Sequence, residues 1–138
     1  AMMQSYLTRP ASDFEAGGVL LGRYILDCSD VVVDSVTVPM LGDVRSRTGF
    51  LRRAKGHQAA VDQAWLQSMH TCNYLGRWHT HPGGALTPSS VDTLDWTKAL
   101  RKEQFDSASL FFVLIASDAI AIWEGDKITR ALAQLERA

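Results

Sequence analysis

Two periodicities separate the expected strands from the expected helices of this chain. Residues 17–27 (GGVLLGRYILD) are largely apolar, and residues 31–39 (VVVDSVTVP) alternate valine with polar residues before a proline, as strands do. Only Asp27 to Asp30 separate the two runs, which predicts a hairpin. Three later runs, 74–81, 110–117 and 119–125, also predict strands, with a short turn at Ser117-Asp118. The unbroken apolar run 110–117 predicts a buried central strand.

Helical spacing of apolar residues marks two further segments. Residues 56–71 predict a helix with one apolar stripe, in which we expect Trp65 and Met69 to belong to the core. Residues 89–105 predict a second helix, because apolar positions recur at helical spacing and basic residues come late, where the helix dipole favours them. The apolar positions are Ala60, Val61, Ala64, Trp65 and Met69 in the first segment, and Leu94, Ala99 and Leu100 in the second.

The remaining segments fix the order of elements. Residues 40–49, with Arg45 and Arg47, predict a solvated polar loop, and residues 82–88 (PGGALTP) exclude regular structure. Residues 127–137 fit a strand as well as a helix. The order is strand, strand, helix, strand, helix, strand, strand, which predicts a single α/β (α+β) domain over residues 1–138.

Composition narrows the class of protein. The chain has 138 residues, 46% of them hydrophobic and 21% charged, which is ordinary globular usage for one domain. The net charge of −1 gives no pull toward nucleic acid or an acidic membrane. The longest apolar run (SLFFVLIA) is too short to cross a bilayer, and the N-terminus lacks a signal-peptide core, so we expect a cytoplasmic protein. Cys28 and Cys72 predict two buried thiols rather than a disulfide.

The candidate chemistry lies in residues 74–96 (YLGRWHTHPGGALTPSSVDTLDW). His79 and His81 point the same way in a strand because side chains alternate, and two imidazoles at a strand end can bind one metal ion. Gly83 and Gly84 allow a sharp turn, after which the next helix can bring Asp92 back to the strand end. Asp95, one turn further on, is a second candidate ligand.

Simpler interpretations compete with a metal site. Ser89 and Asp92 have the spacing of a capping box, and Thr87 followed by Pro88 offers another helix start. Glu15 taken alone is a solvated acid before a strand. His57 and His70 lack such neighbours and are expected at the surface, while Trp78 and Trp96 are expected to pack in the core and Asp95 to face solvent.

The spacing nevertheless resembles a known family. HTHP at 79–82, six intervening residues and Ser89-Ser90-Val91-Asp92 are similar to the JAMM motif, His-x-His-Pro-x6-Ser-x-x-Asp, of the JAB/MPN metalloproteases. The segment FEAGGVLLGRY places Glu15 before Gly17-Gly18, like the E-x-GG-x-L-G segment of that family. The resemblance spans about residues 14–125 and implies an MPN/JAB-like domain, with a mixed β-sheet flanked by helices as in the cytidine deaminases.

The resemblance also implies roles for five residues. His79, His81 and Asp92 would bind one Zn²⁺, with a catalytic water in the fourth position. Glu15 would act as general base and Ser89 would stabilise the oxyanion. The family usually has another strand and a fuller helix before the glutamate, whereas about fourteen residues precede Glu15, so residues 1–13 are expected to be an abbreviated or truncated N-terminal segment.

Within the family, the sequence of residues 74–96 is similar to that of bacterial JAB isopeptidases, including those of CBASS antiphage operons. The same similarity covers Phe50, Arg53, His57 and Trp65. This similarity implies deubiquitinase-like hydrolysis of the amide between the C-terminal tail of a ubiquitin-like or cGAS-like nucleotide-cyclase protein and its target. A catalytically silent MPN-type interaction module and a peptidase that processes a sulfur-carrier precursor are the alternatives. The sequence leaves open the tail-binding strand, the oligomeric state and the role of loop 40–49.

Overall fold

The fold is built on one mixed β-sheet, and we describe residues 2–7, 14–28, 30–84, 86–103, 107–116 and 119–135 of the computed structural model. The strand order is β2-β1-β5-β6-β7-β8. These strands are β1 (Gly17–Tyr24), β2 (Val31–Val36), β5 (Asn73–Thr80), β6 (Ser109–Ile115), β7 (Ile120–Asp126) and β8 (Leu132–Gln134). The predicted hairpin, β1 with β2, and the predicted internal position of β6 are both confirmed.

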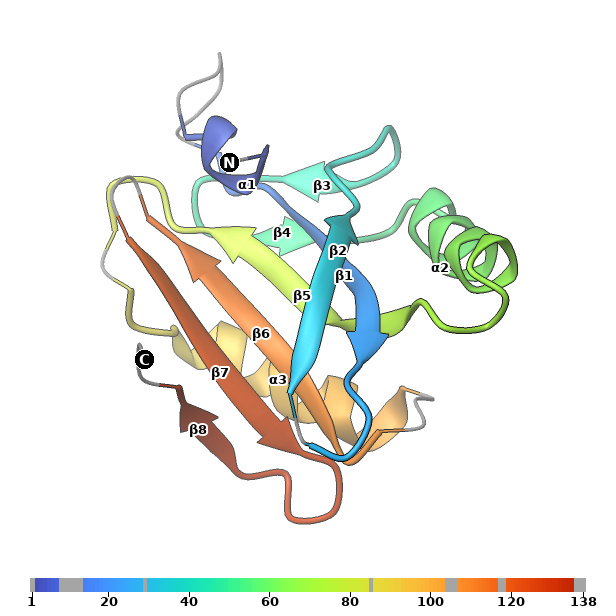
Figure 1. The fold of residues 1–138 in the computed structure, drawn as a ribbon. Coiled ribbons are helices and arrows are strands. Elements are labelled where there is room, and N and C mark those ends of the chain that lie inside the picture. The colour runs from blue at the N-terminus through green and yellow to red at the C-terminus, as the bar shows by residue number, and fades with distance from the viewer. Residues whose placement is uncertain are drawn as a thin grey trace.

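Two helices cover one face of the sheet, and a short helix lies on the other (Figure 1). Alternation along β6 divides its side chains: Leu110, Phe112 and Leu114 pack under α3 (Ser90–Lys102). Cross-strand neighbours share a face, and the register Val19–Arg77–Phe112 places α2 (Gly56–Gln67), which covers Val19, on the same side as α3. The short α1 (Met2–Ser5) contributes to the cluster on the opposite face. The mixed sheet flanked by helices is therefore confirmed.

The connection between β5 and β6 brings a helix start to a strand end. These two strands run parallel, whereas the other neighbouring strands described in the sheet are antiparallel. A parallel pair needs a crossover, and α3 supplies it. In such a crossover the N-terminus of the helix lies near the carboxyl end of the first strand. The histidines at the end of β5 consequently meet the first turn of α3.

The prediction that Trp65 and Met69 belong to the core is wrong. Their exposed fractions are 36% and 86%, whereas Val61 and Ala64 pack against the sheet. The helix ends at Gln67, and Met69 has a φ of 58°, so its side chain projects from the turn that follows. The ring of Trp65 instead stacks on His70, which is exposed as predicted.

His57 is buried, which contradicts its expected surface position. Its two ring nitrogens lie 2.7 Å from Thr37 Oγ1 and 2.6 Å from Asp43 Oδ2, so both are satisfied inside the protein. The Asp43 carboxylate also accepts hydrogen bonds from three backbone N–H groups, those of Met40, Arg53 and Ala54. One buried carboxylate therefore fixes both ends of the segment 40–54 and the start of α2.

That segment is more ordered than the predicted solvated loop. Val44–Arg45 form β3, which pairs antiparallel with β4 (Phe50–Leu51) in a separate two-stranded sheet. The other side chain named with this loop, Arg47, is exposed as expected. The expectation of a solvated loop is therefore wrong for Arg45, which is half-buried and donates a hydrogen bond to the Glu15 carbonyl, just before β1.

We expect the Asp43→Asn variant to lose about 2–4 kcal/mol of unfolding free energy at pH 7, because a buried charged acceptor disappears. Burial alone would raise the pKa of Asp43, but hydrogen bonds from Ala54, His57 and Met40 outweigh it and hold the pKa below its usual value. This stabilisation is complete above the unfolded pKa of about 4 and is lost as the pH falls through the folded pKa.

Urea unfolding at several pH values checks this prediction. The variant should lose less stability than the wild type when the pH falls below about 4. The control is Asp34→Asn, which removes an exposed acid paired with Arg23 and should leave the unfolding midpoint at neutral pH nearly unchanged. If Asp43→Asn matched the wild type at neutral pH, the carboxylate would not be an anchor.

The other sequence expectations have mixed outcomes. Cys72 is buried as predicted, but Cys28 is exposed because it lies in the turn between β1 and β2. Leu94 is also exposed, whereas Ala99 and Leu100 are buried. The ambiguous segment 127–137 contains the strand β8. The predicted turn at 117–118 and the expected helix end at 104–105 lie outside the described residues, and α3 is assigned up to Lys102.

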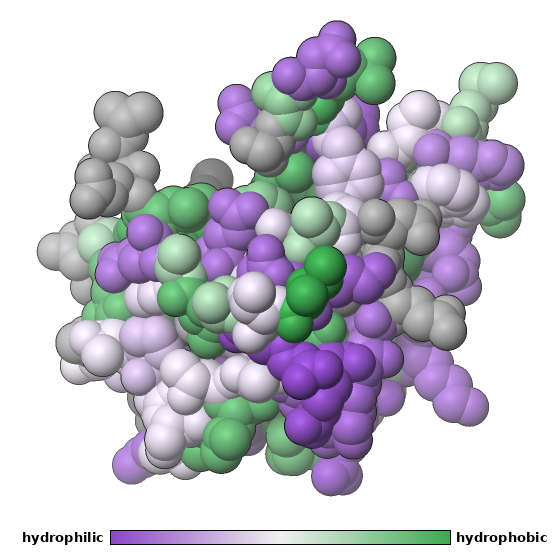
Figure 2. Space-filling model, turned by 90° about the horizontal axis from the view of Figure 1, so that it is seen from below, coloured by the Kyte–Doolittle hydropathy of each residue, from purple (hydrophilic) through white to green (hydrophobic). Residues whose placement is uncertain are grey.

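The surface is mixed in character. Figure 2 shows polar and apolar residues side by side on one face, together with a compact, strongly hydrophilic area. Such mixing is usual at the surface of a folded domain, where apolar atoms still contribute much of the exposed area. Among the described residues, no helix combines the length and the apolar character needed to cross a bilayer.

Candidate metal centre

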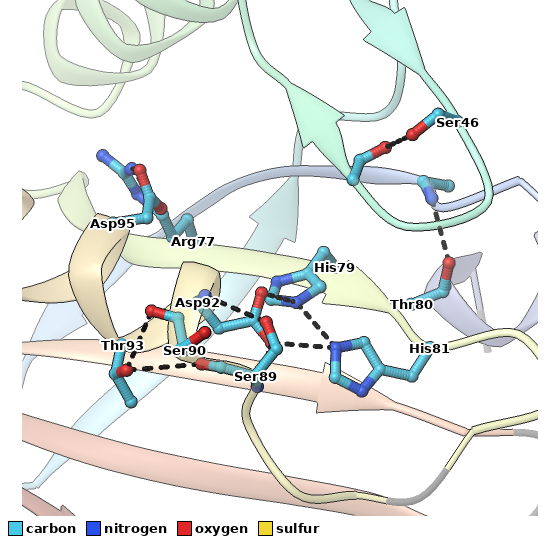
Figure 3. A network of polar contacts seen from close by, with 12 residues as sticks. Ser46, Arg77, His79, Thr80, His81, Ser89, Ser90, Asp92, Thr93 and Asp95 are labelled. Carbon is cyan, nitrogen blue, oxygen red and sulfur yellow. Dashed lines mark hydrogen bonds and ion pairs between the residues drawn. The ribbon is translucent and has the colours of Figure 1, made fainter.

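The two histidines at the end of β5 point toward the same place (Figure 3). Their Nε2 atoms lie 3.2 Å apart, as strand alternation predicts for residues two apart. Thr80, between them, points to the opposite face and is fully buried. Its hydroxyl accepts a hydrogen bond from the Ala16 N–H at 2.9 Å, and its own N–H donates to the Ala16 carbonyl at 2.8 Å. Thr80 thereby ties the histidine strand to the residue that follows Glu15.

The predicted capping box is present at the start of α3. The Ser89 hydroxyl accepts from the Asp92 N–H at 3.1 Å, and Asp92 Oδ2 accepts from the Ser89 N–H at 2.9 Å. Ser89 has an extended backbone, as a residue that caps a helix should. The alternative start at Thr87 and Pro88 is therefore wrong.

The Asp92 carboxylate serves the cap and the histidines at once. Oδ1 lies 3.1 Å from the Nε2 of His79, and Oδ2 lies 2.9 Å from the Nε2 of His81. Burial alone would raise the pKa of Asp92. Hydrogen bonds from His79, His81 and the Ser89 N–H outweigh that effect, so the pKa lies well below its usual range. Asp92 is therefore a carboxylate anion that both caps α3 and faces two imidazoles.

Glu15 joins the same cluster from the start of β1. A side-chain oxygen of Glu15 and one ring nitrogen each of His79 and His81 all lie within 4.8 Å of one another. Glu15 is 7% exposed, and burial raises its pKa above the usual value, although the two nearby imidazoles offset part of the rise. The cluster thus holds two acids whose pKa values shift in opposite directions, a pattern that often separates an anion from a proton carrier.

The donor set fits a small cation. In a tetrahedral zinc site with bonds of about 2.0–2.1 Å, neighbouring ligand atoms lie about 3.3 Å apart. The two Nε2 atoms lie 3.2 Å apart, that of His79 lies 3.1 Å from Asp92 Oδ1, and that of His81 lies 2.9 Å from Asp92 Oδ2, all close to that value. Two imidazole nitrogens and one carboxylate are also a ligand set that catalytic zinc uses. Their chemistry and spacing therefore both suit Zn²⁺.

A narrow cleft leads to the cluster. Its volume is about 140 Å³, and its lining includes Glu15, His79 and Asp92 together with residues of the β3–β4 hairpin. A larger cavity of about 510 Å³ lies on the α2 side. Arg52 lines both the cleft and the larger cavity.

Asp95 lies beside this cleft but does not face the histidines. It is exposed, as predicted, and its carboxylate accepts two hydrogen bonds from Arg77 at 2.9 and 3.1 Å (Figure 3). Arg77 is buried and also contacts Tyr74 and Glu103, so it joins β5 to the middle and to the C-terminal end of α3. No motif in the sequence predicts this cluster, although the two-residue period of a strand places Arg77 on the same face as His79.

Trp78 and Trp96 pack in the core as predicted, and each is 1% exposed. The ring of Trp96 lies beneath His79, with centroids 6.2 Å apart. It therefore supports the imidazole from the core side, where it is out of reach of a substrate.

Comparisons with known proteins agree with this geometry. A family profile described as prokaryotic homologs of the JAB domain matches residues 5–128. Several curated relatives carry the name CD-NTase/cGAS isopeptidase, including the following three. The Pseudomonas aeruginosa protein is 35% identical over 80% of this chain and 68% of its own length. The Escherichia coli protein is 30% identical over 98% and 81%, and the Vibrio cholerae protein is 34% identical over 82% and 67%.

A solved structure extends the agreement to the fold. The solution structure of protein DSY2949 from Desulfitobacterium hafniense superposes with a TM-score of 0.57 at 18% identity, covering 98% of this chain and 84% of that one. At that identity the likeness concerns the fold alone. The family profile and the curated relatives confirm the resemblance drawn from the spacing of the HxHP and Ser-x-x-Asp segments. The chain belongs to the prokaryotic family of JAB-domain homologs.

Proposed function

We propose that this protein is a zinc-dependent isopeptidase that releases a CD-NTase (cGAS-like nucleotide cyclase) from a target to which its C-terminal tail is conjugated. The observation that carries the proposal is the convergence of His79, His81 and Asp92 on one point, with Glu15 beside them. The names of the three curated relatives support the choice of substrate. An antiphage-defence role follows from that choice.

His79, His81 and Asp92 would hold the metal ion. When bound there, zinc supplies a Lewis acid that polarises a carbonyl and makes water a nucleophile at neutral pH. The three side chains are held in place independently of any ion. Thr80 is bonded to Ala16, Asp92 lies in the cap of α3, and the ring of Trp96 packs against His79. Such support keeps ligands in a productive geometry.

Glu15 would move the protons. Its buried carboxyl group has a raised pKa, which suits a group that takes a proton from water and passes it to the leaving amine. Asp92, with its lowered pKa, suits the opposite role of a permanent anion. The two acids therefore divide the work between proton transfer and charge compensation.

Ser89 would stabilise the oxyanion. Its hydroxyl oxygen accepts the N–H of Asp92, and within the described part of the chain no hydrogen bond donated by that hydroxyl is found. A hydroxyl can accept and donate at the same time, so its proton is available to a developing negative charge. Ser89 is exposed at the surface, where a substrate carbonyl can reach it. Capping and catalysis are thus compatible at this residue.

The shape of the site supports an extended substrate. The cleft beside Glu15 and His79 has a volume of only about 140 Å³, which favours small residues next to the scissile amide. The larger cavity, which shares Arg52 with the cleft, offers a path for the chain that leads to it. A flexible C-terminal tail can follow such a path, whereas a folded domain cannot.

Cleavage of a conjugate tests the proposed function. The substrate is a CD-NTase whose tail is joined through an amide to a reporter protein, and the zinc content of the enzyme is measured in parallel. We expect cleavage at the junction and one zinc per chain. A zinc-loaded chain that binds the conjugate but leaves it intact would instead be an interaction module. Cleavage of a sulfur-carrier fusion alone would redirect the substrate assignment.

For Ser89→Ala we expect a loss of turnover of about 10²- to 10³-fold with zinc retained, because one oxyanion donor disappears. The cap also weakens, which costs about 1 kcal/mol of unfolding free energy. Steady-state kinetics, zinc analysis and thermal unfolding measure the three quantities. The matched control is Ser90→Ala, an exposed serine one residue on, which should retain turnover. Loss of zinc from Ser89→Ala would make its role architectural.

A further inference from the structure

The β3–β4 hairpin forms hydrogen bonds with the main chain at Glu15. The Arg45 guanidinium donates to the Glu15 carbonyl at 2.9 Å through Nε and to the Phe14 carbonyl at 3.2 Å through Nη2. The Glu15 N–H donates to the Ser46 carbonyl at 2.7 Å. Both peptide groups that flank the Glu15 Cα are therefore bonded to the hairpin.

These hydrogen bonds hold the backbone of Glu15, which strand pairing in the sheet does not. The β1–β5 pairing begins at Gly17 with His79, so Glu15 lies outside the strand ladder. Ala16 is held from the other side by Thr80, which lies between the two histidines at the end of β5. Glu15 consequently sits between the histidine strand and the hairpin, and the hairpin contacts fix the rotation of its backbone. A buried side chain at such a point takes its direction from that backbone.

The hairpin itself is firmly anchored. Asp43, immediately before β3, is held by His57 and by backbone N–H groups on both sides. The turn of the hairpin closes with the Ser46 N–H donating to the Gly49 carbonyl at 2.9 Å. Arg45 also lies over the ring of Tyr6, 5.8 Å from its centroid. The anchored hairpin and the packed guanidinium give Arg45 a fixed position, which suits a residue that must hold another residue in place.

We propose that Arg45 is a positioning residue for the reaction: by fixing the peptide groups of Phe14 and Glu15, it directs the Glu15 carboxyl group toward His79 and His81. The inference rests on the proposed function, in which Glu15 moves the protons. Arginine suits the task because its planar fork donates to two carbonyls in fixed geometry, which a lysine cannot do. Small misplacement of a proton-transfer group costs turnover without weakening substrate binding.

The test compares Arg45→Ala and Arg45→Lys with Arg53→Ala. Arg53 is an exposed arginine in the same segment, and it controls for loss of charge. We expect Arg45→Ala to lower kcat about 10- to 100-fold with little change in KM and with zinc retained. Arg45→Lys should recover part of the loss, and Arg53→Ala should match the wild type. In a Glu15→Gln background, Arg45→Ala should cause no further loss, because its target is already disabled.

Hydrogen exchange gives a readout that does not depend on turnover. The Glu15 amide is bonded to Ser46, so exchange of the peptide 14–20 should accelerate in Arg45→Ala and stay unchanged in Arg53→Ala. Faster exchange with unchanged kcat would overturn the positioning role. Unchanged exchange would show that Arg45 does not hold the main chain at Glu15, and would also overturn the proposal. A parallel rise in KM and fall in kcat, with a lowered melting temperature in both Arg45 variants, would mark a purely structural brace and also overturn it. Failure of the proposed function differs from all of these, because the wild type and Arg53→Ala would then cleave no conjugate whatever the exchange rates are.

Discussion

Replacing Glu15 by glutamine is expected to lower turnover by about 10²- to 10⁴-fold, which is the usual contribution of a general acid–base group. Glutamine keeps the volume of the side chain in its buried position, but it cannot accept a proton. The histidines and Asp92 are untouched, so zinc content and substrate binding should remain. Steady-state cleavage of the CD-NTase conjugate and metal analysis of the same preparation measure both effects.

Glu124→Gln is the control for the Glu15 variant. Glu124 is a half-buried acid on β7 that accepts a hydrogen bond from Ser109, and an amide oxygen can replace that acceptor. Its substitution should leave kcat within about twofold of the wild type, as expected away from special sites. Retained turnover in Glu15→Gln would remove Glu15 from the mechanism, and loss of zinc from that variant would make Glu15 a ligand.

Replacing Asp92 by asparagine should have the second large effect, which is loss of the metal and of turnover together. The amide keeps an oxygen that can accept the Ser89 N–H, so the helix cap survives in form. It loses the negative charge that compensates a divalent cation. We expect zinc in the purified variant to fall to background and cleavage to fall with it. Circular dichroism should still report the fold.

The matched control for Asp92 is Asp95, one helical turn further on. Asp95 lines the same cleft but pairs with Arg77, so Asp95→Asn should retain zinc. Removing zinc from the wild type with a chelator should reproduce the inactivity of Asp92→Asn, and adding zinc back should restore only the wild type. If Asp92→Asn retained one zinc per chain, Glu15 would be the third ligand, since its side chain lies within 4.8 Å of both imidazole nitrogens.

Short-range rules already predict the proximity of three of the candidate site residues. His79 and His81 share a strand face, and Asp92 follows Ser89 at capping distance, so short-range rules already indicate how these residues meet. Glu15 was different, because its distance from the histidines depends on the pairing of β1 with β5. Its place among them came only from the resemblance to a family.

The errors share a physical cause. Helical periodicity identifies the stripe of α2 that contains Trp65, but it does not say where the helix stops or how narrow its contact with the sheet is. The sequence near His57 does not predict its burial, because its partners, Thr37 and Asp43, are 20 and 14 residues away. The burial of Arg45 is not predicted for the same reason, because its partners, the carbonyls of Phe14 and Glu15, are 31 and 30 residues away. Polar contacts between residues far apart in the chain leave no periodic pattern in the sequence, so a single sequence does not predict them.

The parallel pairing of β5 with β6 ties catalysis to the completion of folding. The His81 N–H donates to the Ile115 carbonyl, so the last histidine is fixed only when a strand made some thirty residues later has docked. Glu15 needs the opposite edge of β5. A nascent chain therefore carries all of its reactive side chains before it can cleave anything. During refolding, cleavage activity should consequently appear in one cooperative step, together with the folded structure. Fragments that stop before β6 should be inactive even with zinc present.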